Sequence, residues 1–135
     1  MKPLRTEFQS GMDINRPGVL AELSVAFARY ERALVGNDIA VLDELFWDSP
    51  HTVRYGTGEN LYGIDEIRAF RAARSPVGLA REVLRTQITT FGDSLATTHI
   101  EFRRVGSQRI GRQTQSWIRR PEGWRVVSAH VSLMP

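Results

Sequence analysis

Apolar residues in the first third of the chain recur with the period of an α-helix. Five of them are spaced three and four residues apart, which puts them on one helix face: Leu20, Leu23, Phe27, Tyr30 and Leu34. Asn15 is a suitable N-cap and Pro17 suits a first turn, so we expect the helix to begin near Asn15. Gly36-Asn37 is a helix stop. Residues 1–14 show no clear period and are expected to be a flexible extension.

Two shorter helices and a strand pair follow. Asp38 can cap the second helix, whose buried face would be Ile39, Leu42, Leu45 and Phe46. Residues 52–55 and 60–62 have the character of short strands around a Gly56-Thr57-Gly58 turn. Gly63 opens the third helix, and its inward side would be Ile64, Ile67, Phe70, Arg71 and Arg74.

The second half of the chain has the pattern of a β-meander. Strands are expected over 81–91, 94–103, 109–119 and 124–133, with turns at Gly92-Asp93, 105–108 and 121–123. Helices followed by such a meander indicate an α+β fold. We expect a single domain over residues 15–135.

Composition fits this picture and excludes several classes of protein. The 135 residues are 41% apolar and 24% charged, as in an ordinary globular domain. No apolar run is long enough for a membrane span and no signal peptide is evident, so we expect a cytoplasmic protein with no membrane partner. The sequence has no cysteine, which excludes disulfides and thiol nucleophiles. His51, His99 and His130 show no metal-binding spacing, so neither a metal nor another cofactor is expected.

Charge is distributed unevenly along the chain. Residues 1–67 hold 6 basic and 11 acidic groups, whereas residues 68–135 hold 12 basic and 4 acidic groups. Of the 18 basic residues only Lys2 is a lysine. The arginines form no basic run, so we expect no nucleic-acid partner. Arginine also binds small carboxylates through two parallel hydrogen bonds, which makes a small-molecule carboxylate the favoured ligand.

The last predicted strand alternates between polar and apolar positions. Strict alternation places five residues on one face: Trp124, Val126, Ser128, His130 and Ser132. His130 between two serines indicates either the wall of a polar cavity or a half-buried histidine that bonds to a neighbour. Both faces of the strand would carry apolar residues, and helices can cover only one face. This predicts a homodimer through the sheet.

The preceding strand places Gln113, Gln115 and Trp117 on one face. Two amides beside an indole are typical of a ligand pocket with a stacking wall, although they also fit the solvent-facing side of a sheet. Tyr30 on the apolar stripe of the first helix needs a partner for its hydroxyl, or a wet tip. Arg54 lies in a short strand among apolar or small neighbours and is difficult to explain as a surface residue.

The predicted order of elements resembles the NTF2-like fold, also called the SnoaL-like or cystatin-like cone. The ending GRQTQSWIRRPEGWRVVSAHVS is similar to the final hairpin of that superfamily, which includes the kinase hub domains. The resemblance implies three helices packed on a curved antiparallel sheet, with a pocket at the mouth of the cone.

A narrower resemblance is to the AtzH-like family. The similar stretches are FARYERALVGNDIAVLDELFW, TVRYGTGENLYGIDEIRAFRAAR, ITTFGDSLATTHIEFRR and the final hairpin, which together run from Phe27 to Ser132. The member that names the family is a decarboxylating amidohydrolase of a dicarboxylated urea. The resemblance therefore implies a metal-independent amidohydrolase of a ureido- or amide-type (di)carboxylate. The alternative is a non-catalytic carboxylate-binding or oligomerisation module of the kinase hub type.

The resemblance and the residue patterns together name a candidate site. Arg54 would bind the substrate and stabilise developing negative charge, and Tyr30 or His130 would transfer the proton. Five further residues would hold the substrate: Arg71 or Arg74 as a carboxylate clamp, Trp117 as a stacking wall, and Gln115 and Ser132 as hydrogen-bonding groups.

Overall fold

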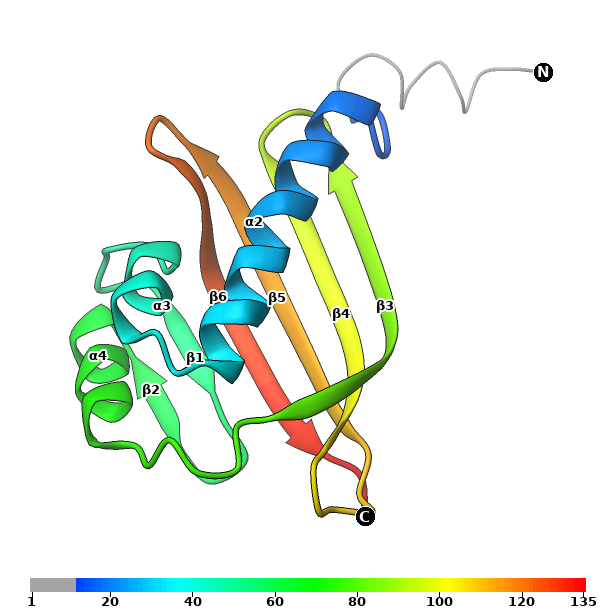
Figure 1. Ribbon diagram of the computed structural model, residues 1–135. Helices are drawn as coiled ribbons and strands as arrows, with labels where there is room; N and C mark the ends of the chain where they lie inside the picture. Colours follow the sequence, from blue (N-terminus) through cyan, green and yellow to red (C-terminus); the bar gives the residue numbers. More distant parts are fainter. Residues whose placement is uncertain (1–11) are drawn as a thin grey trace.

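The computed structural model describes residues 12–135, which form three helices on a six-stranded sheet (Figure 1). The helices are α2 (Pro17–Val35), α3 (Ile39–Leu45) and α4 (Ile64–Ala73). The strands are β1 (Val53–Tyr55), β2 (Asn60–Tyr62), β3 (Arg81–Phe91), β4 (Leu95–Arg104), β5 (Gly111–Arg120) and β6 (Gly123–Leu133). The predicted α+β fold is therefore confirmed.

The sheet has the order β2-β1-β6-β5-β4-β3. The predicted meander is confirmed, because β3 to β6 pair antiparallel in chain order. The short β1 strand pairs antiparallel with β2 but parallel with β6, so the sheet is mixed rather than wholly antiparallel. All three helices lie on one side of the sheet, with α2 crossing its long strands and α3 and α4 at the β1–β2 end (Figure 1).

The start of α2 differs from the predicted cap. Asn15 has a φ of 55°, and its side chain accepts a hydrogen bond from the Thr90 amide at 2.8 Å instead of capping the helix. Arg16 occupies the N-cap position without a side-chain cap bond. Residues 1–11 of the predicted extension lie outside the described part of the chain, and within it Ile14 bridges to Phe91.

The core lies between the helices and the inner face of the sheet. Leu23, Phe27 and Tyr30 of α2 are buried, as the periodicity predicts. The inner faces of β4 and β5 supply Phe102 and Trp117, which are both fully buried. Burying such apolar area is the main stabilising contribution to a fold of this size.

The predicted alternation of the last strand is wrong beyond Val126. Trp117 pairs with Val126 but Ser116 pairs with Ser128, so Val127 is an extra residue, a β-bulge. The bulge shifts the later residues by one position, so that each faces the opposite side to the one predicted. Ala129 is buried on the inner face as a result, and His130 is exposed on the outer face.

Gly111, at the start of β5, tests the packing of this core. A Cβ atom there would lie 2.3 Å from the nearest atom of the buried Phe102 ring. We expect Gly111→Ala to lower the free energy of unfolding by about 1–3 kcal/mol, because the fully buried ring must shift within the core to make room for the added atom. Urea denaturation measures the change, with Gly58→Ala as control, since no atom lies within 4 Å of its added Cβ. Equal stability of the two variants would contradict this packing.

Candidate functional site

A cleft opens where β1, the carboxyl end of α4, the start of β3 and the end of β4 meet. Its outer part has a volume of about 280 Å³ and is lined by residues that include Arg54, Glu59, Phe70, Arg74, Arg104 and Val131. A narrower inner part of about 30 Å³ continues to Tyr30, Arg81 and Gln113. Both parts share Arg54, Arg74 and Arg104, so they form one space, which we call the arginine cleft.

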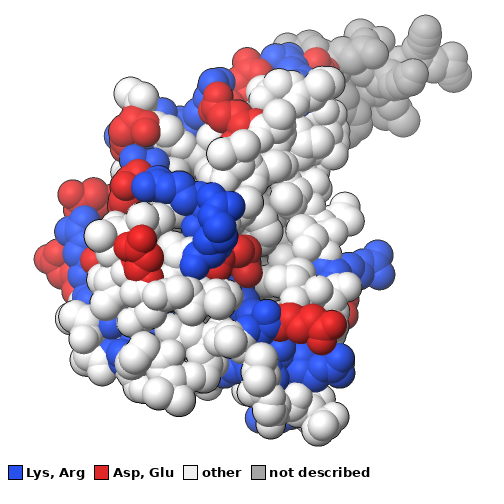
Figure 2. Space-filling model, in the orientation of Figure 1, with Lys and Arg blue, Asp and Glu red and all other residues white. Residues whose placement is uncertain are grey.

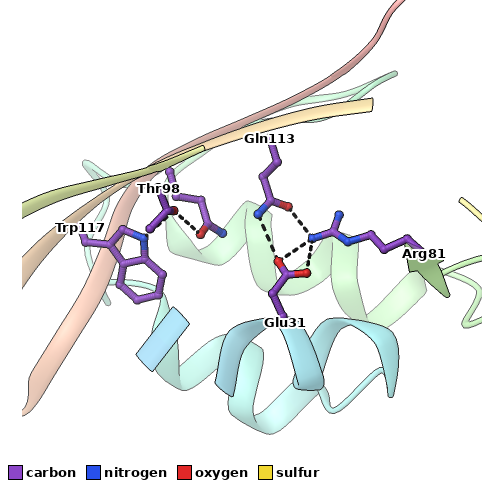
Figure 3. Close-up of polar contacts among 6 residues, drawn as sticks. Glu31, Arg81, Thr98, Gln113 and Trp117 are labelled. Carbon is purple, nitrogen blue, oxygen red and sulfur yellow. Dashed lines mark hydrogen bonds and ion pairs between the residues drawn. The ribbon is translucent and has the colours of Figure 1, made fainter. Parts of the chain in front are cut away.

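Two of the four cleft arginines have a carboxylate partner. Arg81 Nη2 donates to Glu31 Oε2 at 2.6 Å and to Gln113 Oε1 at 3.0 Å, so α2, β3 and β5 are joined there (Figure 3). Arg54 Nη1 donates to Glu59 Oε2 at 2.8 Å. These pairs are largely buried, so their charges interact more strongly than pairs in water would.

The other two cleft arginines, Arg74 and Arg104, have no carboxylate within ion-pair distance among residues 12–135. Arg74 Nε and Nη2 are buried without a hydrogen-bond partner in that part of the chain. Burial lowers the pKa of Arg74, and the neighbouring Arg54 cation lowers it further. Burial also lowers the pKa of Arg104, followed by repulsion from Arg81. An anion in the cleft would offset both the cost of removing these guanidinium groups from water and the repulsion between the arginines.

Arg71 and Arg74 have different environments, although the sequence places them on one helix stripe. Arg71 is 2% exposed, donates to Asp43 Oδ1 at 2.9 Å and packs on the Phe46 ring at 4.2 Å. It is absent from the lining of the cleft. α4 ends at Ala73, and Arg74 adopts an extended backbone with ψ of 139°, which directs its side chain to the cleft.

Tyr30 brings a phenol to the inner end of the cleft. It is 4% exposed, and its ring packs against that of Phe46 with centroids 6.2 Å apart. A negative charge on Tyr30 would raise the pKa of both Arg71 and Arg74, so its hydroxyl lies within electrostatic range of two cations.

The structure does not bring His130 or Ser132 to the cleft. His130 shares the outer face with Tyr55, and the two rings meet edge to face at 5.6 Å. Arg54 faces inward with Ala129, its partner in register. Ser132 lines a separate hollow on the His130 side. The bulge at Val127 is the physical reason.

Gln115 and Trp117 face inward as predicted, but they lie in the core rather than along the cleft. Trp117 Nε1 donates to Thr98 Oγ1 at 3.0 Å, and Thr98 Oγ1 donates to Gln115 Oε1 at 3.1 Å (Figure 3). Both residues are fully buried and neither lines the cleft. Both side chains are therefore linked through Thr98 of β4, while Gln115 Nε2 has no hydrogen-bond partner among the described residues.

Sequence reasoning missed Arg81, Arg104 and Glu31. Arg81 and Arg104 pair directly across the β3–β4 hairpin. The predicted turn at Gly92-Asp93 signals that β3 and β4 pair, but its register, if extended, would place Arg81 opposite Val105. The irregularity between Val83 and Arg85 moves Arg81 opposite Arg104 instead. The role of Glu31 carried no such signal, because its partners are 50 and 82 residues away in sequence.

No metal site was found in the part of the chain that the structure describes, where no three His, Asp or Glu side chains cluster suitably. Within residues 12–135, no helix is long and apolar enough to cross a membrane. Acidic and basic side chains are interspersed on the face shown in Figure 2.

The Arg71–Asp43 pair predicts a contrast between two adjacent acidic residues. Asp43→Asn should lower the free energy of unfolding by about 3 kcal/mol, because it leaves a buried guanidinium without a counter-charge. Glu44→Gln should cost under about 1 kcal/mol, since the Arg29–Glu44 pair is exposed. Chemical denaturation of both variants measures the contrast. A cost for Asp43→Asn no larger than that for Glu44→Gln would show that Arg71 is not held as described.

Comparisons with known proteins place the chain in a family. No curated protein matches it. A protein of unknown function from Pectobacterium atrosepticum is 60% identical, with a TM-score of 0.91 over 93% of this chain and 100% of that one. A cystatin-like fold protein from Burkholderia xenovorans is 47% identical, with a TM-score of 0.88 and the same coverage. An NTF2-like protein from Pseudomonas putida, at 19% identity and a TM-score of 0.70 over 90% and 89% of the two chains, shares the fold.

The family model of the AtzH-like proteins matches residues 12–135, nearly the whole chain. This match, together with the cystatin-like and NTF2-like neighbours, agrees with the three helices on one side of a curved sheet. The chain belongs to the AtzH-like family within the NTF2-like fold.

Proposed function

We propose that the chain binds a small carboxylate in the arginine cleft and acts on it as an amidohydrolase of ureido- or amide-type (di)carboxylates. The observation that carries the proposal is the pair of arginines, Arg74 and Arg104, that lack a carboxylate partner among the described residues. Buried cations are costly unless an anion accompanies them. A carboxylate ligand supplies that anion and binds guanidinium groups through paired hydrogen bonds.

The charges of the cleft favour a ligand with two carboxylates. Four arginines line the cleft, but these arginines have only two carboxylate partners, Glu31 and Glu59. The surplus is two positive charges, which a dianion would balance. A dicarboxylate of a few carbon atoms also suits an outer space of about 280 Å³.

The proton transfer falls to Tyr30 in this proposal, because His130 is on the other face of the sheet. For a substrate with a carboxylate on nitrogen, the C–N bond breaks, carbon dioxide leaves and the electron pair stays on nitrogen. Tyr30 would donate its hydroxyl proton to that nitrogen and regain one from water. Nearby Arg71 and Arg74 would stabilise the transient tyrosinate, and Arg54 the negative charge on the substrate.

A thermal-shift screen against small mono- and dicarboxylates, including ureido acids, tests the proposal. Ligands that stabilise the protein are then assayed for release of ammonia or carbon dioxide. With dicarboxylates, Arg54→Ala and Arg74→Met should each lose most of the thermal shift, and Arg54→Ala should abolish turnover. Arg68→Met is the matched control, because Arg68 lies on α4 with an exposed side chain. Normal binding by Arg74→Met would contradict the anion site.

A second candidate function is a carboxylate-binding or oligomerisation module without catalysis, as in the kinase hub domains. The separation of His130 from the cleft favours it, since a binder needs the arginines but not a second proton-carrying group. Tyr30→Phe separates the two functions. The enzyme should keep ligand binding and lose turnover by at least about 100-fold. If ligands stabilise the wild-type protein but none is turned over, the result would favour the non-catalytic carboxylate-binding module.

We also propose that the chain forms a homodimer through the outer face of the sheet. The predicted reason, apolar residues on both faces of β6, does not apply, because Trp124, Val126, Ala129 and Val131 all face inward. Instead, the outer face carries Arg85, Glu101 and Arg112 side by side, and a two-fold axis could pair these opposite charges between two copies. Light scattering after size exclusion should give about twice 15.3 kDa, and Glu101→Arg should give a monomer. A wild-type protein of 15.3 kDa at micromolar concentration would contradict the dimer.

A further inference from the structure

The carboxylate of Glu59 already occupies part of the arginine cleft. Its Oε2 atom accepts a hydrogen bond from Arg54 at 2.8 Å, and its Oε1 atom accepts one from the Gly58 amide at 3.2 Å. The Glu59 side chain is 23% exposed and that of Arg54 is 12% exposed. A carboxylate from the chain itself therefore contacts the arginine that the proposed function assigns to the substrate.

Gly56 makes this contact possible. A Cβ atom at that position would lie 1.8 Å from Glu59 Oε2 and 3.0 Å from Arg54 Nη1. Any residue with a side chain would push the Glu59 carboxylate away from Arg54. The absence of a side chain at Gly56, the first residue of the turn, thus allows the Glu59 side chain to fold back over it.

The Arg54–Glu59 pair differs from the other buried pairs in what holds the acidic partner. Glu31 and Asp43 lie on helices, α2 and α3, that pack on the sheet. Glu59 lies in the turn between two three-residue strands, where Thr57 and Gly58 are exposed. The turn is closed by one bond, from the Gly56 amide to the Glu59 carbonyl at 2.9 Å. Glu59 is not part of the hydrophobic core cluster.

Glu59 also acts on the two arginines without carboxylate partners. Burial lowers the pKa of Arg74 and of Arg104, and the Glu59 carboxylate raises both. Arg54 and Arg74 are further linked through Phe70, whose ring centroid lies 5.4 Å and 5.9 Å from their guanidinium carbons. Moving Glu59 away would leave three neighbouring cations, Arg54, Arg74 and Arg104, available to a ligand.

We propose that Glu59 is an internal counter-ion that holds Arg54 in the unliganded protein and is displaced by one carboxylate of a dicarboxylate ligand. This inference rests on the proposed function and extends it to specificity. A monocarboxylate can bind Arg74 and Arg104 while Glu59 stays on Arg54. A dicarboxylate can place its second carboxylate on Arg54, in the position that Glu59 vacates. Glu59 therefore restricts access to Arg54 to ligands with two negative charges.

Calorimetric titration with malonate and with propionate tests the proposal. Glu59→Gln removes the competing charge, so its affinity for malonate should rise about tenfold over wild type. Its affinity for propionate should rise less, because a single carboxylate does not need Arg54. Glu82→Gln is the control, since Glu82 is exposed and faces outward with Arg103. Thermal unfolding of each variant checks that it is folded.

Gly56→Ala separates displacement from the loss of charge. It keeps the negative charge of Glu59 but forces the carboxylate off Arg54, so malonate should again bind more tightly than in wild type. An unchanged malonate affinity in Gly56→Ala would overturn displacement, as would a malonate affinity of Glu59→Gln no higher than that of wild type. In those cases Arg74→Met still tests the anion site by itself. If neither malonate nor propionate binds any of these proteins, the proposed function and this inference fall together.

Discussion

Repulsion between the four guanidinium groups of the arginine cleft is the main physical constraint on this end of the sheet. Arg81 and Arg104 are directly opposite one another on β3 and β4, and Arg54 and Arg74 pack near the same phenylalanine ring. Four guanidinium groups in one cleft lose water and repel one another, which opposes folding. The fold tolerates them because the register of two hairpins fixes three of them, Arg54, Arg81 and Arg104, and because Glu31 neutralises Arg81 with a contact of 2.6 Å.

The Glu31–Arg81 contact also connects the chemistry to the architecture. Glu31 is the neighbour of Tyr30 on α2, and it is bonded to side chains of β3 and β5 (Figure 3). The ion pair therefore fixes both the position of the helix along the sheet and the depth of the Tyr30 ring in the cleft. A buried pair of this kind contributes little net stability, but loss of either partner would leave an uncompensated charge within this arrangement of α2, β3 and β5. In this protein that arrangement places a phenol beside arginines.

The sequence predicted the elements well, since their signals are local. The apolar spacing of α2, the cap at Asp38, which accepts from the Val41 amide, and the turn at Gly92 all depend on neighbouring residues. The candidate site was predicted less well. Tyr30, Arg54 and Arg74 line the cleft, whereas Trp117 and Gln115 bond within the core. Burial of Trp117 and the ion pair of Arg71 depend on contacts between distant segments, which no local pattern encodes.

The bulge at Val127 determines which chemistry the sheet can present on each side. Without it, strict alternation would direct His130 inward on the same face as Trp124, and Ala129 and Val131 outward. With the extra residue, Val131 becomes part of the apolar wall of the arginine cleft, and His130 joins the polar outer face. A single inserted residue thus places His130 and the cleft residue Val131 on opposite faces from those that strict alternation predicts. Tyr30 and Glu59 remain among the residues that line the cleft, while Arg85, Glu101 and Arg112 lie together on the outer face.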